Sequence, residues 1–361
     1  MDYSKFPYNF DPKYVSTILE QSQDIDTPLD LTKRADRHQY FHKRLGSDLE
    51  RFKEIFAKYT FLAYWLAPKS AGKGTYIGLI KEIVGDDKFA QISVGDLVRE
   101  FQQRYNAGQQ KELEKELAPH YRGFMPLKEA MEATAVPDLQ KTMPTEFVLA
   151  LIKTKIDKLE GKIVFLDGFP RTEDQILYAL VMRDLVAYRS DPDFFVLIHI
   201  PIQIIDDRFK YRRVCPKCGL SRNIHLLPTE KVEWDTQKNE PILICENPEC
   251  NNQPLVAKQG DHLGVKGLEN RLVKDYKLVQ MAQNLHGIPK INLYNAVPAD
   301  QAKDLVKDYE LTPWFEFEYK NGQVIRSTKP YSVFQDNKEY YSLLAGPATV
   351  QFIRQILEVF D

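Results

Sequence analysis

The sequence has no long hydrophobic run. Its longest apolar stretches, Phe61 to Ala67 and Phe194 to Ile200, fall far short of the about 20 apolar residues that a membrane-spanning helix needs. The first residues, "MDYSKFPYNFDPKYVS", carry early acidic side chains and no apolar segment typical of a secretory signal. These two absences predict a soluble cytoplasmic protein without a membrane partner.

The sequence also lacks an excess of charge of either sign. Its 51 acidic residues nearly balance 49 Lys and Arg residues, and the formal net charge is −2. Such a balance produces no overall field that would attract nucleic acid or an anionic membrane. We therefore expect no nucleic-acid partner, and the function must be sought in local sites.

Cysteine is scarce, and its few copies are clustered. All four lie between Cys215 and Cys250, in the pairs "CPKCG" and "CENPEC". Two such pairs can offer four thiolates to one tetrahedral zinc ion, here from Cys215, Cys218, Cys245 and Cys250. Free buried thiols or a disulfide are the alternatives, and a redox role is a weaker one. The clustering predicts one local site rather than disulfides spread across the fold.

Short apolar runs alternate with helical patterns along the rest of the chain. This order is typical of an α/β fold in which helices cover a parallel sheet. Five runs are candidate strands: Phe61 to Ala67, Phe89 to Val94, Ile163 to Asp167, Phe194 to Ile200 and Lys290 to Tyr294. The sequence therefore predicts a three-layer fold with a parallel five-stranded sheet flanked by helices.

Two insertions and two extensions surround this core. A helical insertion, about 97–159, follows the second candidate strand, and a turn-rich insertion, about 208–262, follows the fourth and holds every cysteine. Residues 1–58 form an extension with a charged helical segment, and residues 311–361 form another. In the latter, alternating residues around Asn321-Gly322 predict a hairpin, and Ala348 to Phe360 reads as an amphipathic helix.

The stretch "LAPKSAGKGTY", Leu66 to Tyr76, has few of the glycines expected in a phosphate-binding loop. Such loops use glycine because several backbone N–H groups must converge on one anion. The pattern G-x-x-x-x-G-K-[ST] would put its first glycine at Ala67, whereas Gly72, Lys73, Gly74 and Thr75 remain. The loop follows an apolar run and precedes a helix, whose N-terminus favours negative charge. An ordinary strand-to-helix turn is the alternative.

A second motif, "IVFLDGFPRTEDQ" from Ile163 to Gln175, favours a phosphate-binding loop over an ordinary strand-to-helix turn. It places Asp167 at the end of a strand, then a Gly-Phe-Pro turn, then Arg171 and Gln175. With this motif the sequence resembles the adenylate kinases, within the nucleoside monophosphate kinase family. The resemblance covers about Tyr59 to Tyr309 and implies the P-loop fold of that family, with a monophosphate-binding helical insertion and a lid.

The resemblance implies roles for individual residues. It places Gly72, Lys73, Gly74 and Thr75 on the donor phosphates of ATP, to which Arg208 and Arg212 also bind. Transfer would depend on a set of cations that counter the charge of two nucleotides, since phosphoryl transfer needs charge placement more than covalent chemistry. This implied catalytic set is Lys73, Arg171, Arg208, Arg212 and Arg271.

On the acceptor side, the resemblance implies that Arg99 and Arg171 hold the phosphate of AMP and that Gln175 meets the adenine edge. Asp96 and Asp167 match carboxylates that act on Mg²⁺ through its waters. Four further positions are implied to contact AMP: Val94, Met143, Gly168 and Lys258.

The sequence departs from the family pattern at several of these places. Ala67, Lys69 and Ser70 replace residues of the family's loop, two of them glycines, which predicts a reshaped loop. Val94 stands where threonine is usual, and this removes a hydroxyl near the acceptor base. Lys258 occupies a place where we expect an arginine.

The cysteine pairs resemble the zinc-bearing lid of some bacterial adenylate kinases, which implies a structural zinc away from the reacting phosphates. We expect a monomer that catalyses reversible phosphoryl transfer from Mg-ATP to AMP, giving two ADP, in nucleotide homeostasis. A kinase for CMP, UMP or GMP is the alternative within this class. A non-catalytic adenylate sensor is the alternative outside it, and a zinc-ribbon nucleic-acid binder ranks last because no basic stripe surrounds the cysteines.

Overall fold

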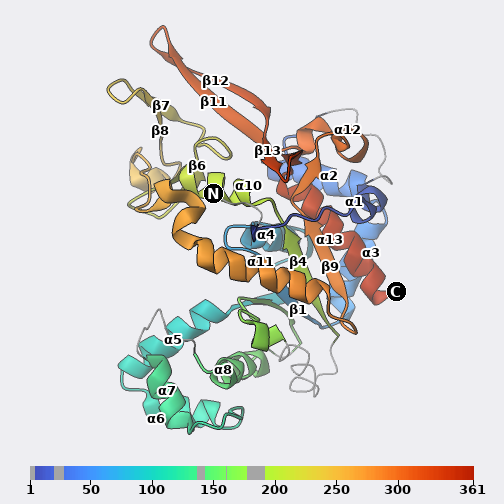
Figure 1. Cartoon of the computed structure of the whole chain (residues 1–361), viewed down its shortest axis with the longest axis vertical. Coiled ribbons are helices and arrows are strands. Elements are labelled where there is room, and N and C mark those ends of the chain that lie inside the picture. The colour runs from blue at the N-terminus through green and yellow to red at the C-terminus, as the bar shows by residue number, and fades with distance from the viewer. Residues whose placement is uncertain (1–4, 20–27, 136–142, 160, 177–191) are drawn as a thin grey trace.

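The computed structural model describes residues 5–19, 28–135, 143–159, 161–176 and 192–361 of the chain. A central parallel sheet has the strand order β2-β3-β1-β4-β9 (Figure 1). Its strands are β1 (Leu62–Leu66), β2 (Phe89–Ser93), β3 (Ile163–Asp167), β4 (Asp193–His199) and β9 (Lys290–Tyr294). All five predicted strands are confirmed, and each predicted end lies within one residue of the observed end. No helix in the described ranges is long and apolar enough to cross a membrane.

The sheet separates two hydrophobic cores because alternate side chains of a strand point to opposite faces. On β1, Ala63 and Trp65 join one core, whereas Leu62, Tyr64 and Leu66 join the other. Every residue of β1 is buried, as expected for a strand covered by helices on both faces.

Helices from both ends of the chain contribute to the first core. These are α1 (Pro12–Leu19), α2 (Arg34–Leu45), α3 (Asp48–Lys58), α4 (Lys73–Val84) and α13 (Ala345–Phe360). The predicted helical segment around 37–58 is divided at Gly46, whose φ of 53° suits a residue without Cβ. Phe352 on α13 packs its ring against Phe52 and Trp65, with centroids 6.2 and 5.6 Å away.

The N-terminal extension is joined to the end of the core by a buried ion pair with Glu310, and to the C-terminal extension by a bond from Arg354 Nη2 to the Arg44 carbonyl at 2.8 Å. Arg44 on α2 donates from Nε to Oε1 of Glu310 at 3.1 Å and from Nη2 to Oε2, and both side chains are almost fully buried. The N- and C-terminal segments are therefore packed together as part of one core with the sheet.

The helical insertion and the cysteine-bearing insertion lie toward opposite ends of the long axis of the molecule (Figure 1). The helical insertion contains α5 (Val94–Asn106), α6 (Gln110–Leu117), α7 (Leu127–Ala135) and α8 (Thr145–Asp157). Its buried side chains, such as Phe101 and Phe147, belong to the second core.

The cysteine-bearing insertion follows α10 (Ile202–Lys210) and is built from two short hairpins. They are formed by β5 (Arg212–Val214) with β6 (Ser221–Asn223), and by β7 (Val232–Asp235) with β8 (Glu240–Leu243). We call residues 211–260 the lid. The 3₁₀ segment η4 (Asp261–Leu268) and the long helix α11 (Glu269–Gln283) lead back to the sheet.

The C-terminal extension contributes two strands to a small second sheet and also forms a long hairpin. The small sheet has the order β10-β14-β13, from β10 (Ala296–Pro298), β13 (Ser332–Gln335) and β14 (Lys338–Ser342), with α12 (Ala302–Leu305) beside β10. The predicted hairpin is confirmed as β11 (Pro313–Lys320) and β12 (Gln323–Pro330), joined at Asn321-Gly322. The predicted C-terminal helix is also confirmed, and it begins at Ala345.

The hairpin stands alongside the lid (Figure 1). The Phe315 N–H donates to the His225 carbonyl at 2.8 Å, and the Trp314 ring stacks on the His225 ring at 4.3 Å. Nearer the tip, Trp234 of β7 stacks on Tyr319 of β11 with centroids 5.9 Å apart. The extension therefore contacts the lid along much of the length of the hairpin.

Candidate active site

The loop between β1 and α4 lines a cavity even though it lacks most of the expected glycines. Gly72 has φ of 105° and directly precedes α4. Ser70 also has a positive φ, 67°, although it carries a Cβ atom. The Ala71 N–H donates to the Pro68 carbonyl at 3.2 Å and so closes a β-turn. The loop leads into a helix N-terminus, where free N–H groups and the helix dipole favour an anion.

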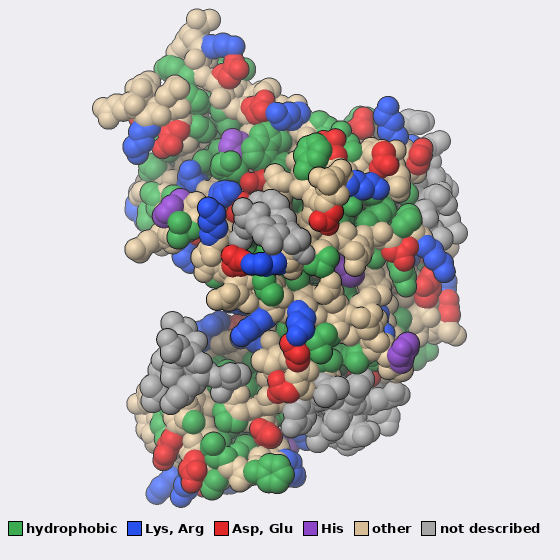
Figure 2. Space-filling model, in the orientation of Figure 1, with side chains coloured by type: hydrophobic (Ala, Val, Ile, Leu, Met, Phe, Trp, Pro, Cys, Tyr) green, Lys and Arg blue, Asp and Glu red, His purple; other side chains and the backbone are tan. Residues whose placement is uncertain are grey.

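A cavity of about 920 Å³ opens over this loop. Figure 2 shows the molecule hollowed between the lid side and the helical insertion, with Lys and Arg side chains at the edge. Predicted site residues that line the cavity are Gly72, Lys73, Gly74, Thr75, Asp167, Gly168, Arg171, Arg208, Arg212 and Arg271. The structure thus brings together the whole predicted catalytic set, which comes from four separate parts of the chain.

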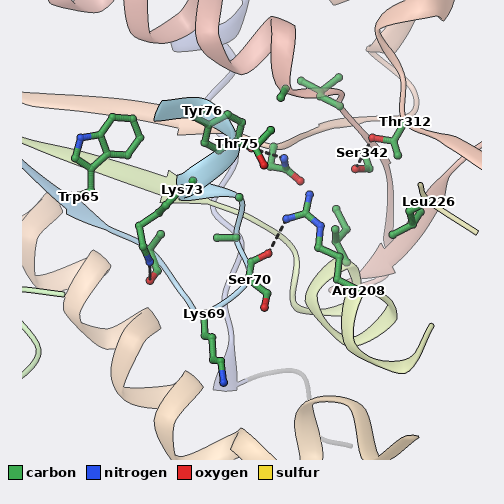
Figure 3. A pocket seen from close by; sticks show the side chains of 18 of the residues that line it. Trp65, Lys69, Ser70, Lys73, Thr75, Tyr76, Arg208, Leu226, Thr312 and Ser342 are labelled. Atoms are coloured by element: carbon green, nitrogen blue, oxygen red, sulfur yellow. Dashed lines mark hydrogen bonds between the residues drawn. The ribbon is translucent and has the colours of Figure 1, made fainter. Parts of the chain in front are cut away.

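Several Lys and Arg side chains of the cavity form hydrogen bonds or ion pairs with other groups of the protein. Lys73 Nζ donates to the Ala67 carbonyl at 3.1 Å and lies 3.5 Å from Oδ1 of Asp167. Arg208 Nη1 donates to the Ser70 carbonyl at 2.8 Å, which Figure 3 shows as a bridge from α10 to the loop. Arg212 forms two bonds with Asp261, each 2.7 Å long. These contacts orient the cations before any ligand is bound.

The cations also repel one another. Burial lowers the pKa of Arg171, and the neighbouring charge of Arg271 lowers it further. Burial likewise lowers the pKa of Lys69. The charges of Arg271, Arg212 and Lys258 lower this pKa further. A polyanion bound among these groups would relieve the repulsion, so the cavity suits phosphate groups.

Two arginines converge at the edge of the sheet beside the helical insertion. A Cβ atom on Gly95 would lie 3.5 Å from Nη1 of Arg99 and 3.6 Å from Nη2 of Arg171, so both guanidinium groups lie over this glycine. A Cβ atom on Gly168 would lie 2.7 Å from Nη2 of Arg171. The absence of a side chain at Gly168 therefore makes room for Arg171, whereas a Cβ atom on Gly95 would be in ordinary van der Waals contact. Asp96 pairs with Arg99 and is exposed.

The remaining predicted acceptor residues do not line this cavity. Gln175 is buried, and its amide is engaged within the protein: Oε1 accepts the Arg171 N–H at 2.8 Å, and Nε2 donates to Thr145 Oγ1 at 3.2 Å. Val94 is buried at the start of α5. Met143 is partly buried against the second core, and Lys258 is exposed.

Sequence reasoning did not find several residues of the cavity. Asp275 on α11 accepts the Lys69 N–H at 3.2 Å. Two residues of the C-terminal extension, Thr312 and Ser342, also line the cavity (Figure 3). Their hydroxyl oxygens are 3.0 Å apart. A carboxylate or hydroxyl of this kind looks like an ordinary surface group in the sequence, and only the tertiary contacts bring it here.

The four cysteines form one compact cluster in the lid. Their Sγ atoms all lie within 4.8 Å of one another, with Cys215 and Cys250 3.8 Å apart and Cys218 and Cys245 3.6 Å apart. Four sulfurs at about 2.3 Å from a tetrahedral zinc ion lie about 3.8 Å from each other. The donor set and its spacing therefore fit one tetrahedral metal ion.

The chain is similar in sequence to proteins named adenylate kinase. It is 31% identical to one from Thermotoga petrophila over 171 residues, which is 47% of this chain and 66% of the relative. It is 34% identical to one from Clostridium acetobutylicum over 169 residues, which is 46% of this chain and 66% of the relative. These two matches thus span just under two thirds of the relatives' length.

A longer match comes from Thermotoga neapolitana, whose adenylate kinase is 31% identical over 221 residues, 58% of this chain and 87% of the relative. No family model matches the chain. The parallel sheet, the Gly72–Thr75 loop at the N-terminus of α4 and this match agree with one another. The chain therefore belongs to the adenylate kinase family of phosphotransferases.

Proposed function

We propose that this protein is an adenylate kinase, which transfers a phosphoryl group reversibly from Mg-ATP to AMP and gives two ADP. The observation that carries the proposal is the convergence of Lys73, Arg171, Arg208, Arg212 and Arg271 on one cavity at the N-terminus of α4. An array of this kind suits a reaction in which two polyanions must approach each other.

The donor phosphates would bind at the loop. N–H groups of the Gly72–Gly74 segment would cradle the β- and γ-phosphates, whereas the Thr75 N–H donates to the Gly72 carbonyl at 2.9 Å. The Lys73 ammonium would exchange its contact with the Ala67 carbonyl for a phosphate oxygen. Arg208 at the end of α10 and Arg212 at the start of β5 also line the cavity. They would bind the triphosphate from the side opposite the loop.

The acceptor phosphate would lie against Arg99 and Arg171, whose guanidinium groups converge over Gly95. An oxygen of this phosphate would attack the γ-phosphorus while the bond to the β–γ bridging oxygen breaks. The attacking oxygen is ionised before transfer, and the bridging oxygen leaves with the electron pair of the broken bond as an ionised oxygen of ADP, so no proton has to move in the transfer step. Arg171 and Arg271 would stabilise the charge that is shared between the two nucleotides.

Mg²⁺ enters with ATP and supplies further charge neutralisation on its phosphates. Asp167, 3.5 Å from Lys73 Nζ, would act on its water shell, and we keep Asp96 as a second candidate for this role. In the lid, Cys215, Cys218, Cys245 and Cys250 would hold a structural zinc ion that fixes the two short hairpins. A cytoplasmic monomer suits this proposal, because thiols stay reduced in that compartment.

The internal bonds of Gln175 and the valine at position 94 favour a second candidate. If the Gln175 amide keeps its bonds to the Arg171 N–H and to Thr145, it is not free to read an adenine edge. The acceptor would then be another nucleoside monophosphate. In either case we propose residues 59–310 as the kinase core, with Val94, Met143, Gly168, Gln175 and Lys258 near the acceptor.

The test follows ADP formation from Mg-ATP with AMP, CMP, UMP and GMP, each supplied separately, with Lys73→Ala as the control. Activity with AMP alone that is lost in the control supports adenylate kinase. Activity with another monophosphate supports the second candidate. ATP binding without transfer to any of the four would refute catalysis and favour an adenylate sensor.

A further inference from the structure

Ser70 occupies a backbone conformation that its residue type disfavours. Its φ of 67° lies in the left-handed region, where a Cβ atom crowds the backbone. It is the third residue of the Pro68–Ala71 turn, a position that usually takes glycine or asparagine when φ is positive. Contacts from outside the turn must therefore stabilise this conformation of Ser70.

Two side chains from other elements bind the backbone of this turn. Asp275 Oδ2 accepts the Lys69 N–H at 3.2 Å, and Arg208 Nη1 donates to the Ser70 carbonyl at 2.8 Å. The bond to the Lys69 N–H comes from α11, and the bond to the Ser70 carbonyl comes from α10. Arg208 also has a proposed role with the phosphates, whereas Asp275 has none.

Asp275 is an unexpected residue to find in an anion-binding cavity. It lines the cavity one helical turn after Arg271, where a negative charge opposes a bound triphosphate. Burial raises its pKa, and the charge of Arg271, its bond to the Lys69 N–H and the charge of Lys73 act in the opposite direction. A carboxylate in this place needs a role that outweighs its repulsion of the ligand.

We propose that Asp275 is a positioning residue that holds the phosphate-binding loop in its ligand-ready shape, in place of the glycine that position 70 lacks. In this role it acts through the Lys69 N–H rather than on the reacting atoms. The inference rests on the proposed function in one respect, namely that ATP binds at this loop.

The test measures ATP affinity by isothermal titration calorimetry in Asp275→Ala, Asp275→Asn, Ser70→Gly and the double variant Ser70→Gly/Asp275→Ala. The Ala and Asn variants lose the same charge, but the amide oxygen of Asn can still accept the Lys69 N–H. We expect Asp275→Ala to bind ATP about fivefold more weakly than Asp275→Asn, as the loss of one hydrogen bond predicts.

Rescue separates positioning from a general loss of structure. Glycine adopts a φ of 67° without penalty, so Ser70→Gly in the Asp275→Ala background should restore ATP affinity to that of Asp275→Asn. AMP affinity and the melting temperature should change little across the set. Glu269→Ala, which removes a half-buried acid on the same helix that pairs with Lys5, is the matched control.

Equal ATP affinity in Asp275→Ala and Asp275→Asn, or a double variant no better than Asp275→Ala, would overturn the proposal. A wild-type protein that binds ATP but transfers nothing to a monophosphate would refute the proposed function alone. A wild-type protein that binds no ATP would refute both.

Discussion

Replacing Trp314 by alanine should loosen the contact between the C-terminal hairpin and the lid. The Trp314 ring stacks on His225 with centroids 4.3 Å apart and an interplanar angle of 7°, and it meets the edge of Tyr211 at 5.6 Å. Aromatic pairs contribute about 0.5 to 1.5 kcal/mol each beyond their buried area. Two lost pairs therefore weaken docking by about 1 to 3 kcal/mol, or roughly 5- to 150-fold in the docking equilibrium.

Hydrogen–deuterium exchange detected by mass spectrometry reports this equilibrium directly. The Phe315 N–H donates to the His225 carbonyl at 2.8 Å, so it exchanges only when the hairpin leaves the lid. In Trp314→Ala we expect its exchange to accelerate by the same 5- to 150-fold factor. Phe334→Ala, an exposed residue of β13, is the control.

Unchanged exchange at Phe315 in Trp314→Ala would refute the reasoning, because the backbone contact would then hold the hairpin without the aromatic stack. If the whole protein exchanged faster, the substitution would have lowered global stability instead. Exchange in the central sheet distinguishes these outcomes, since it should remain slow when only the hairpin is released.

Four further predictions concern other parts of the chain. Arg171→Ala should lower the transfer rate on the order of 10³-fold with the fold retained, as judged by circular dichroism. Cys250→Ser, or a strong chelator, should lower the melting temperature of the lid, and equal stability with and without zinc would contradict a structural metal. Glu310→Gln leaves the Arg44 charge buried without its carboxylate and should cost about 3 to 5 kcal/mol of unfolding free energy in urea titrations. The hydrogen bond from Arg104 lowers the pKa of Glu116 from 4.5 to about 2, so its stabilising effect is present above pH 4.5 and is lost as the pH falls toward 2; an acid titration of Glu116→Gln should lack this loss.

The sequence predicted the sheet well because buried strands leave a local signal. Short apolar runs bounded by polar turns marked all five strands, and Asn321-Gly322 marked the hairpin because both residues take positive φ, 53° and 80°. The smaller hairpin of β13 and β14 was missed, although its turn residues Asp336 and Asn337 carry a related signal with φ of 51° and 60°.

The site was predictable only where its residues stand in a local motif. Lys73 and Arg171 follow strands in recognisable patterns, and the structure places both in the cavity. The bond of Asp275 to the Lys69 N–H joins residues 206 positions apart, and no local pattern reveals such a contact. The pairing of Arg212 with Asp261 depends in the same way on how the lid folds back onto η4.

The packing of Phe352 on Phe52 and Trp65 has a consequence for synthesis on the ribosome. Helix α13 emerges after the other elements that the structure describes, yet it covers side chains that emerged hundreds of residues earlier. A growing chain that ends before Ala345 leaves these aromatic rings exposed to solvent and to other nascent chains. The first core is therefore completed only after α13 has been synthesised. A product of translation that stops before α13 is prone to aggregation or chaperone binding.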